Sequence, residues 1–323
     1  MNDKSSENIP LLIMAGPTAV GKSALALELA TKLKTDIISA DSAQVYRSLN
    51  IGTAKPTAKE QKYVKHHLIN LVNPDQHFSV ADYQKLAAPT IKLLHQQGKM
   101  PFMVGGTGLY IRAVTDYYAF GKKGGDPTLR KELEFRAAND GIIKLYEALQ
   151  RVDPAAAAKI HPHDQRRIIR ALEVYELEGK PISIQNVETR LRSSPYKTLF
   201  FGLNMERALL YERIENRVDQ MIADGFLEEV EGLRGRGYTK EDPGMQILGY
   251  RQLMGYLEGH LDWEMTVAEI KKQTRNLAKR QLTWFRREKN IRWIDVLETG
   301  SVETIIENIY RKVQDLIPPR ANI

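Results

Sequence analysis

The sequence predicts an α/β fold in which helices flank a parallel β-sheet, with an all-helical insertion in the middle of the chain. Over roughly the first hundred residues, short apolar runs alternate with segments whose apolar residues recur at helical spacing, which is typical of parallel β-α-β units. From about residue 118 to about residue 196 the helical pattern continues without a convincing strand, after a glycine-rich polar junction. We therefore expect a core domain formed by residues 1–117 and 197–323, and a helical insertion domain formed by residues 118–196.

Each expected strand is a short, mainly apolar run bounded by turn residues. These runs are residues 11–15, 36–39, 101–104, 198–203 and 291–294. The expected helices have apolar residues at helical spacing and cover residues 23–33, 79–97, 165–178, 207–234, 245–258 and 267–287. Ser79 and Asp164 are typical N-caps for two of these helices. Gly98 and Gly179 follow the last turns of the same two helices.

The composition excludes several classes of protein. With 323 residues, of which 42% are hydrophobic, the chain is long enough for about two domains and apolar enough for a packed core. No run approaches the ~20 apolar residues that a membrane helix needs, and the polar N-terminus does not resemble a secretory signal. The absence of cysteine excludes disulfides, thiol nucleophiles, iron–sulfur clusters and cysteine-based zinc fingers. We expect a cytoplasmic protein without a membrane partner, and a monomer by default.

A phosphate-binding loop is the strongest local motif. It fits the pattern G-x-x-x-x-G-K-[ST] between an expected strand and an expected helix, and its members are Gly16, Pro17, Thr18, Ala19, Val20, Gly21, Lys22 and Ser23. The glycines let backbone N–H groups converge on phosphate oxygens, Lys22 supplies a full positive charge, and the Ser23 hydroxyl can ligate Mg²⁺. A chance glycine-rich turn is the plainer explanation, but motif and context together disfavour it. The loop predicts a diphosphate or triphosphate ligand in a P-loop NTPase-like fold.

Two further segments are predicted to face the same ligand, because ligands of open α/β sheets bind at the carboxyl ends of the strands. Asp41 follows the second expected strand, where a carboxylate can accept a hydrogen bond or a proton from a substrate amine or hydroxyl. Thr107 lies in the turn 105–108 after the third, and its hydroxyl can donate or accept in the same crevice. A helix cap or turn for Asp41 and a capped glycine turn for Thr107 remain as plainer roles. No apolar strand ends in the acidic residue of a Walker B motif, since Asp36 precedes its strand, and this argues against an ordinary NTPase.

Positive charge is concentrated in one segment. Residues 271–293 hold nine Lys or Arg and a single Glu, whereas the net charge of the whole chain is only +7. The cations on one face of the predicted helix have no acidic partner at helical spacing, except that Lys272 has Glu269. If this face were merely solvated, its positive charges would repel one another. We favour contact with a nucleic-acid backbone over a solvated face, because phosphates remove this repulsion. The predicted contact face forms one arc of a helical wheel opposite apolar residues: Lys272, Arg275, Lys279, Thr283 and Arg286.

Other charged residues are weaker signals. Three arginines oppose the dipole in the first turns of helix 165–178, and this cost slightly favours a functional role: Arg166, Arg167 and Arg170. Arg217 lies one turn from Arg213 and could reach a diphosphate, although ordinary surface cations explain the pair at least as well. The loop 50–56 has a basic tip, which is weak evidence alone. The histidine pairs lack metal-ligand company, so loop or capping roles suit them better: His66 with His67, and His161 with His163.

The phosphate loop, the segments around Asp41 and Thr107 and the basic helical segments resemble, in their order and spacing, those of the tRNA dimethylallyltransferases, also called tRNA isopentenyltransferases. The resemblance covers almost the whole chain, from about residue 11 to about residue 293. The segment GPTAVGKS alone is shared with many kinases, whereas the later segments are far more specific. Asn50 stands where the family usually has Asp, and the zinc finger of eukaryotic members is absent, which indicates the bacterial type. The matching segments are GPTAVGKS (16–23), DSAQVYRSLNIGTAKP (41–56), HHLIN (66–70), PFMVGGTGLY (101–110), RRIIRALEVYELEGKPIS (166–183), QILGYRQ (246–252) and TRNLAKRQLTWFRR (274–287).

The resemblance implies transfer of a dimethylallyl group from dimethylallyl diphosphate to N6 of adenosine 37, beside the anticodon of tRNAs that read codons beginning with U. The phosphate loop would hold the diphosphate, with Mg²⁺ as cofactor on Ser23, while Lys22 and Arg217 stabilise the leaving charge. Asp41 would orient the N6 amine and accept its proton, and Thr107 would help to fix the amine or the diphosphate. The target base would have to flip out of the anticodon stack.

The resemblance also assigns residues that contact the tRNA anticodon stem-loop, which the helical insertion would clasp. Beside the reacting groups they are Asp41, Ser42, Ala43, Gln44 and Thr107, and in the insertion they are Gln165, Arg166, Arg167, Ile168 and Ile169. Towards the C-terminus they are Gln246, Ile247, Leu248, Gly249, Tyr250, Arg251, Thr274, Arg275, Asn276, Leu277, Ala278, Lys279, Arg280 and Gln281.

Three other functions stay open. An isopentenyltransferase that uses free adenine nucleotides would share the phosphate loop and Asp41, but it would not need the basic segment or the insertion. A P-loop small-molecule kinase would need an acidic Mg²⁺ ligand at the end of an apolar strand. A non-catalytic RNA-binding protein would not need Lys22, Ser23 and Asp41 to be intact.

Overall fold

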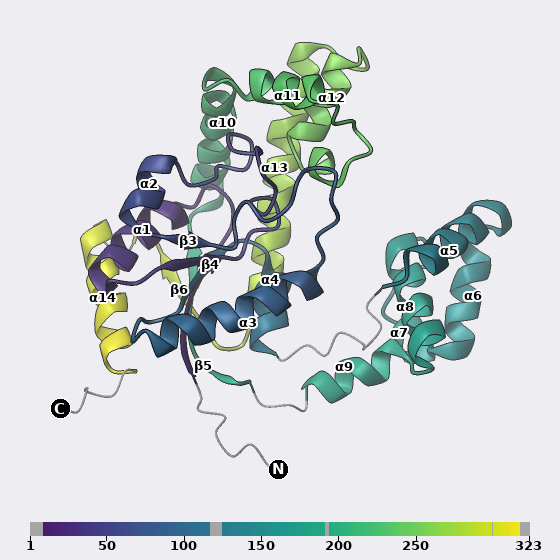
Figure 1. The fold of residues 1–323 in the computed structure, drawn as a ribbon, viewed down its shortest axis with the longest axis horizontal. Coiled ribbons are helices and arrows are strands. Elements are labelled where there is room, and N and C mark those ends of the chain that lie inside the picture. The colour runs from purple at the N-terminus through teal and green to yellow at the C-terminus, as the bar shows by residue number, and fades with distance from the viewer. Residues whose placement is uncertain (1–8, 117–124, 191–193, 299, 317–323) are drawn as a thin grey trace. The chain divides into compact units, whose positions relative to one another are not determined.

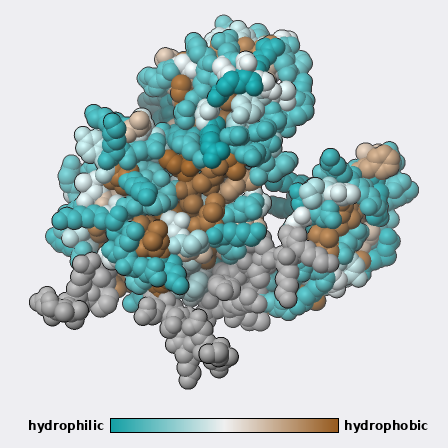
Figure 2. Space-filling model, viewed as in Figure 1, coloured by the Kyte–Doolittle hydropathy of each residue, from teal (hydrophilic) through white to brown (hydrophobic). Residues whose placement is uncertain are grey.

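The structure is a computed structural model that describes residues 9–116, 125–190, 194–298 and 300–316 (Figure 1). The chain divides into two compact units: residues 1–114 with 195–323, here called the core unit, and residues 115–194, here called the helical unit. Hydrophilic residues cover most of the face seen in Figure 2. None of the described helices combines the length and the apolar character that crossing a bilayer requires.

The core unit is built on one six-stranded parallel sheet with the strand order β3-β2-β4-β1-β5-β6. The register pairs Leu12 of the central strand β1 with Phe102 on one side and with Leu199 on the other. The predicted α/β fold with a parallel sheet is therefore confirmed. The strands are β1 (Ile9–Ala15), β2 (Ile37–Ser39), β3 (His66–His67), β4 (Phe102–Gly105), β5 (Tyr196–Asn204) and β6 (Ile291–Asp295).

Helices cover both faces of the sheet, because successive residues of a buried strand point to opposite sides. Leu11 and Ile13 belong to one buried cluster with α3 and α4, whereas Leu12 and Met14 belong to another with α1 and α14 (Figure 1). The helices of the core unit are α1 (Lys22–Leu33), α2 (Ala58–Tyr63), α3 (Val80–Gln96), α4 (Gly108–Thr115), α10 (Arg207–Ala223), α11 (Phe226–Gly235), the 3-10 helix η1 (Pro243–Gln246), α12 (Tyr250–Leu257), α13 (Trp263–Phe285) and α14 (Val302–Gln314).

Two expected helices are each interrupted before a glycine with positive φ, so their prediction as single helices is wrong. The segment 207–234 forms α10 and α11, which are separated at Gly225 with φ 96°. The segment 245–258 forms η1 and α12, and Gly249 precedes α12 with φ 91°. Residues with a side chain rarely adopt this left-handed conformation, whereas glycine does so at little cost. The apolar periodicity continues across both breaks, which is why it conceals them.

Four described elements of the core unit are absent from the sequence prediction. β3 has two residues and α2 has six, which is too few for a periodic pattern. α4 begins at Gly108, the last residue of the predicted turn 105–108. α14 has a clear apolar stripe that could have revealed it, namely Ile305, Ile306, Ile309 and Val313, all of them buried.

The described elements of the helical unit are helices that enclose their own small core. The core packs buried residues from four of these helices, among them Leu133, Leu149, Ala157 and Ile168. The helices are α5 (Pro127–Asp140), α6 (Ile142–Val152), α7 (Pro154–Ala157), α8 (Gln165–Glu178) and α9 (Ile182–Arg190).

A buried carboxylate joins two helices of this unit. The Glu173 side chain is fully buried and accepts hydrogen bonds from the guanidinium groups of Arg130 at 2.9 Å and Arg170 at 2.7 Å. It also accepts one at 3.1 Å from the backbone N–H of Asp126, at the start of α5. Burial alone raises the pKa of Glu173, but the hydrogen bonds from Arg170 and Arg130 outweigh it and lower the pKa below its usual value. Arg170, which the sequence suggested for a functional role, therefore neutralises an internal charge.

We expect Glu173→Ala to lower the free energy of unfolding of the helical unit by about 3 kcal/mol, because two guanidinium groups lose their shared partner. Since the pKa is lowered on folding, the stabilisation by Glu173 is present above the ordinary value of 4.5 and is lost as the pH falls through the lowered value. The rate of amide hydrogen exchange in residues 125–190, measured at increasing urea concentrations, reports the effect. Glu176→Ala is the control, since Glu176 is partly exposed and its nearest cation, on Arg136, is 3.9 Å away. Equal losses in the two variants would contradict the assignment.

Candidate functional site

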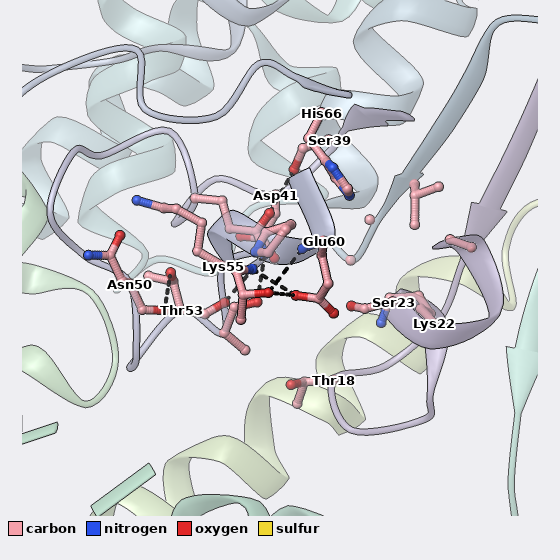
Figure 3. Close-up of a pocket in the computed structure, with 18 of the residues that line it drawn as sticks. Thr18, Lys22, Ser23, Ser39, Asp41, Asn50, Thr53, Lys55, Glu60 and His66 are labelled. Carbon is pink, nitrogen blue, oxygen red and sulfur yellow. Dashed lines mark hydrogen bonds between the residues drawn. The ribbon is translucent and has the colours of Figure 1, made fainter. Parts of the chain in front are cut away.

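Three loops meet at the carboxyl edge of the sheet, because β2, β4 and β1 are adjacent and parallel. The loops after these strands, together with residues from α2, α10 and α13, line a cavity of about 750 Å³. In Figure 3, Lys22 and Ser23 lie on one side of this cavity, and Thr53 and Lys55 lie on the other. The structure therefore brings the phosphate loop and Asp41 to one cavity, as the sequence predicts.

The phosphate loop has the backbone geometry of an anion site. Ala19 and Gly21 both have positive φ, at 64° and 99°, and α1 begins at Lys22. The first N–H groups of a helix have no intrahelical partner and carry partial positive charge, so they are available to an anion. Ser23 is exposed and lines the cavity. The Lys22 ammonium donates a hydrogen bond to the carbonyl oxygen of Pro17 at 2.6 Å.

Lys22, Arg217 and Asp41 are three cavity-lining residues whose charges influence one another. Arg217 lines the cavity from α10, together with Lys22 of the phosphate loop and Asp41 after β2. Burial and the nearby charge of Arg217 lower the pKa of Lys22 to about 7, although Asp41 acts in the opposite direction. Burial also lowers the pKa of Arg217, again against the influence of Asp41. An added anion would relieve the repulsion between the two cations, so the arrangement suits a diphosphate.

Asp41 combines a turn-forming role with a place in the cavity. One of its carboxylate oxygens accepts a hydrogen bond from the backbone N–H of Ala43 at 2.8 Å, which is the plainer role considered from sequence. Its side chain nevertheless lines the cavity and interacts electrostatically with Lys22 and Arg217.

The hydroxyl of Thr107 fastens the loop that carries Asp41. It accepts a hydrogen bond from the backbone N–H of Ser42 at 3.0 Å and donates one to the Ser42 hydroxyl at 3.3 Å. The backbone N–H of Thr107 donates to the carbonyl oxygen of Ala40 at 3.0 Å. Thr107 and Ser42 are not among the residues that line the cavity, so the contribution of Thr107 is to hold the loop that carries Asp41.

The loop 50–56 forms a wall of the cavity, and its basic residue points inward. Lys55 is buried and donates to the carbonyl oxygen of Tyr46 at 2.6 Å and to the side chain of Asn70 at 2.7 Å. Burial lowers the pKa of Lys55 to about 8, against the raising influence of Glu229. The prediction of a basic tip is therefore wrong, because the partners of Lys55 come from chain segments that local sequence does not reveal. Gln44 holds the same wall, since its amide donates to the carbonyl oxygen of Ala54 at 3.3 Å.

The segment 246–251 supports this wall from behind. The side chain of Tyr250 is fully buried, and its hydroxyl donates to Glu229 on α11. The Glu229 carboxylate also accepts from the backbone N–H groups of Asn50 and Ile51, both at 3.0 Å. Sequence reasoning missed Glu229 because nothing in its local pattern distinguishes it from a solvated helix residue. Within the segment, Arg251 is exposed.

The cationic face of α13 is only partly free. Lys272, Lys279 and Arg286 are exposed, but Arg275 forms an ion pair with Glu215 of α10. Lys272 also pairs with Glu269, at 3.2 Å. The pair of Lys272 with Glu269 is the one that helical spacing predicts, whereas the partner of Arg275 comes from another helix, which spacing along α13 cannot reveal.

The segments assigned to tRNA include side chains that cannot reach a solvent-borne ligand. Ile168, Ile169 and Ala278 are buried in addition to Tyr250. Arg166 and Arg167 are both exposed, although the Arg167 guanidinium also lies 3.4 Å from the carboxylate of Asp164. The exposed residues of the same segments, such as Arg166, remain candidates for an RNA contact.

The histidines have local roles. His67 makes a 2.9 Å contact with Asp36, and His66 contacts the carbonyl oxygen of Val64 at 2.8 Å. His161 accepts a hydrogen bond from the backbone N–H of His163 at 3.2 Å. Among the residues that the structure describes, no group of three or more His, Cys, Asp or Glu side chains could hold a metal ion.

Comparisons with known proteins agree with one another. A model of the IPP transferase family matches residues 44–288. The chain is 51% identical over 292 residues to the tRNA dimethylallyltransferase of Moorella thermoacetica, covering 89% of this chain and 90% of the relative. It is 47% identical over 316 residues to that of Pelotomaculum thermopropionicum, covering 97% of this chain and 100% of the relative.

Solved structures are similar as well. The tRNA isopentenylpyrophosphate transferase of Bacillus halodurans matches with a TM-score of 0.71 and 41% identity, covering 95% of this chain and 97% of that one. A eukaryotic dimethylallyltransferase acting on tRNA matches with a TM-score of 0.83 and 28% identity, covering 97% of this chain and 81% of that one. With the phosphate loop, the parallel sheet and these matches over most of its length, the chain belongs to the IPP transferase family.

Proposed function

We propose that this protein is a tRNA dimethylallyltransferase. It transfers a dimethylallyl group from dimethylallyl diphosphate to N6 of adenosine 37 in tRNAs that read codons beginning with U, and it releases diphosphate. The relatives compared above are named for this activity. We further infer that it works as a monomer in the cytoplasm, where tRNA is available.

One observation carries the proposal: Lys22, Arg217 and Asp41 face the same cavity behind a phosphate loop. The two cations suit a diphosphate, but a carboxylate in the same cavity would repel it. Asp41 is therefore best explained by a second reactant that gives up a proton. The exocyclic amine of adenine is such a reactant, because N6 loses a proton when it is alkylated.

The reaction breaks the bond between C1 of the allyl group and a diphosphate oxygen, and it forms a bond between C1 and N6. N6 is a weak nucleophile because its lone pair is delocalised into the ring. Asp41 would accept a hydrogen bond from N6–H, orient the amine and then take the proton. The negative charge on the departing diphosphate would be stabilised by Lys22, Arg217 and the first N–H groups of α1. Thr107 would hold the loop of Asp41 through Ser42.

The donor set fits Mg²⁺ with few protein ligands. The Ser23 hydroxyl is a hard oxygen donor at the first turn of α1, and it lines the cavity beside the proposed diphosphate site. Since no acidic cluster accompanies it in the described residues, diphosphate oxygens and water would complete the coordination of the ion. Ser23 would thus hold a cation that neutralises charge on the leaving group.

The anticodon stem-loop would lie against exposed cations of both units. In the core unit these are Lys279 and Arg280 on α13 and Arg286 and Arg287 just after it, and in the helical unit Arg166 lies in the first turn of α8. RNA loops suit such a surface, because their bases can be splayed out and read singly. The target adenosine would have to leave its stack to bring N6 to Asp41.

Incubation with Mg²⁺, radiolabelled dimethylallyl diphosphate and either anticodon stem-loop RNA or free AMP tests the function. Label in the RNA but not in AMP is the expected result. Label in AMP would identify a nucleotide-using isopentenyltransferase. ATP turnover with no label in either acceptor would identify a kinase and overturn the proposal.

Asp41→Asn should reduce single-turnover transfer by about 10²–10⁴-fold, because the amide cannot accept the proton. The amide oxygen can still accept the hydrogen bond from Ala43, so the fold and the affinity for stem-loop RNA should be nearly unchanged. Rapid-quench transfer and filter binding measure the two quantities. Asp75→Asn, at an exposed position of the same unit, is the matched control. Unchanged transfer by the Asp41 variant would exclude it as the base.

Lys279→Ala should weaken binding of stem-loop RNA and reduce the slope of log K against log salt by about one, because one phosphate contact and its released counterion are lost. Titrations at several salt concentrations measure this slope. Lys271→Ala is the control on the same helix, since Lys271 already pairs with Asp219 at 2.7 Å and should change the slope less. A wild-type slope for the Lys279 variant would indicate a merely solvated side chain.

A further inference from the structure

The α13 side chain of Gln281 bridges two loops of the site. Its amide oxygen accepts a hydrogen bond from the backbone N–H of Thr18 in the phosphate loop at 2.8 Å. Its amide nitrogen donates to the carbonyl oxygen of Gly106 at 3.1 Å, in the turn after β4. Gln281 lines the cavity, and Figure 3 shows Thr18 beside α13. One side chain from α13 therefore joins the ends of β1 and β4.

This bridge needs a primary amide. Thr18 offers a donor and Gly106 offers an acceptor, so the side chain between them must accept at one end and donate at the other. A carboxylate can only accept, an ammonium can only donate, and a hydroxyl is too small to span both groups. The bridge is also tight, since a Cβ atom on Gly106 would lie 2.3 Å from the Gln281 amide nitrogen.

The same side of α13 is docked firmly onto the next turn of the site. Trp284, three residues after Gln281, packs so closely on Gly108 that a Cβ atom there would lie 2.1 Å from its ring. The guanidinium of Arg112 lies 5.0 Å from the centre of the Trp284 ring and pairs with Glu288, which lies just beyond the end of α13. Gln281 and Trp284, three residues apart, form a short row on one face of α13. The exposed Lys279 is outside this row.

We propose that Gln281 is a positioning residue for the diphosphate, rather than one of the tRNA contacts among which its sequence segment placed it. By holding the N–H of Thr18, it sets the shape of the phosphate loop before the anion arrives, so that the remaining N–H groups converge without reorganisation. The inference rests on the proposed function, because it assumes that the loop binds the diphosphate of the substrate. It also means that the helix whose exposed cations face RNA is tied directly to the loop that binds the other substrate.

Gln281→Met tests this, because methionine keeps the length of the side chain and removes both hydrogen bonds. We expect the Kd for inorganic diphosphate with Mg²⁺, measured by calorimetry, to rise about tenfold, while the Kd for anticodon stem-loop RNA stays within about twofold of wild type. In turnover, the KM for dimethylallyl diphosphate should rise more than the KM for RNA. Gln273→Met is the matched control, since Gln273 lies on the same helix and its amide donates only to Glu269, at 2.7 Å.

Gly106→Ala is a second variant, which keeps the glutamine at position 281. The added methyl group should displace the Gln281 amide from the phosphate loop and so weaken diphosphate binding in the same way. Lys279→Ala should show the opposite pattern, with weaker RNA binding and unchanged diphosphate binding. Loss of RNA affinity in Gln281→Met with normal diphosphate affinity would overturn the inference. Wild-type affinities of this variant for both ligands would overturn it as well. If the wild-type protein itself does not bind diphosphate, the proposed function fails instead, and this outcome is visible before any variant is measured.

Discussion

A Cβ atom on Gly105 would lie 2.1 Å from the carbonyl oxygen of Ala40, and one on Gly16 would lie 2.8 Å from the carbonyl oxygen of Leu203. These approaches occur where adjacent parallel strands end, and only glycine permits them without moving the backbone. Because the strand ends stay close, the three loops that follow β1, β2 and β4 converge on one cavity. The phosphate loop and Asp41 depend on this convergence for their position.

Within the cavity, charge is arranged around a ligand rather than around the fold. Lys22 and Arg217 disfavour each other's charge, and Asp41 compensates for only part of that cost. A fold selected for stability alone would separate such cations or pair each of them, as the helical unit does when Arg130 and Arg170 share Glu173. The contrast between these two clusters distinguishes a binding site from an internal ion pair.

The fold follows from the sequence to the extent that local pattern controls it. Alternating strand and helix signals predict a parallel sheet, and the parallel sheet in turn places Asp41 on the edge that holds the phosphate loop. Helix breaks are harder to predict, since periodicity runs through Gly225 and Gly249 and only their backbone conformation shows that the helix stops. β3, with two residues, has no pattern of its own and forms because β2 offers it a partner.

The sequence by itself determined the sheet, the phosphate loop and the candidate base, because each depends on residue types at fixed short spacings. Only the tertiary structure decided which charged and polar side chains are free to meet a ligand. Arg275 is paired by α10, Lys55 is turned inward, and Gln281 is taken up by two loops of the site. Their partners lie far away along the chain, so the contacts depend on how helices and loops pack around the sheet, and no local spacing records that packing.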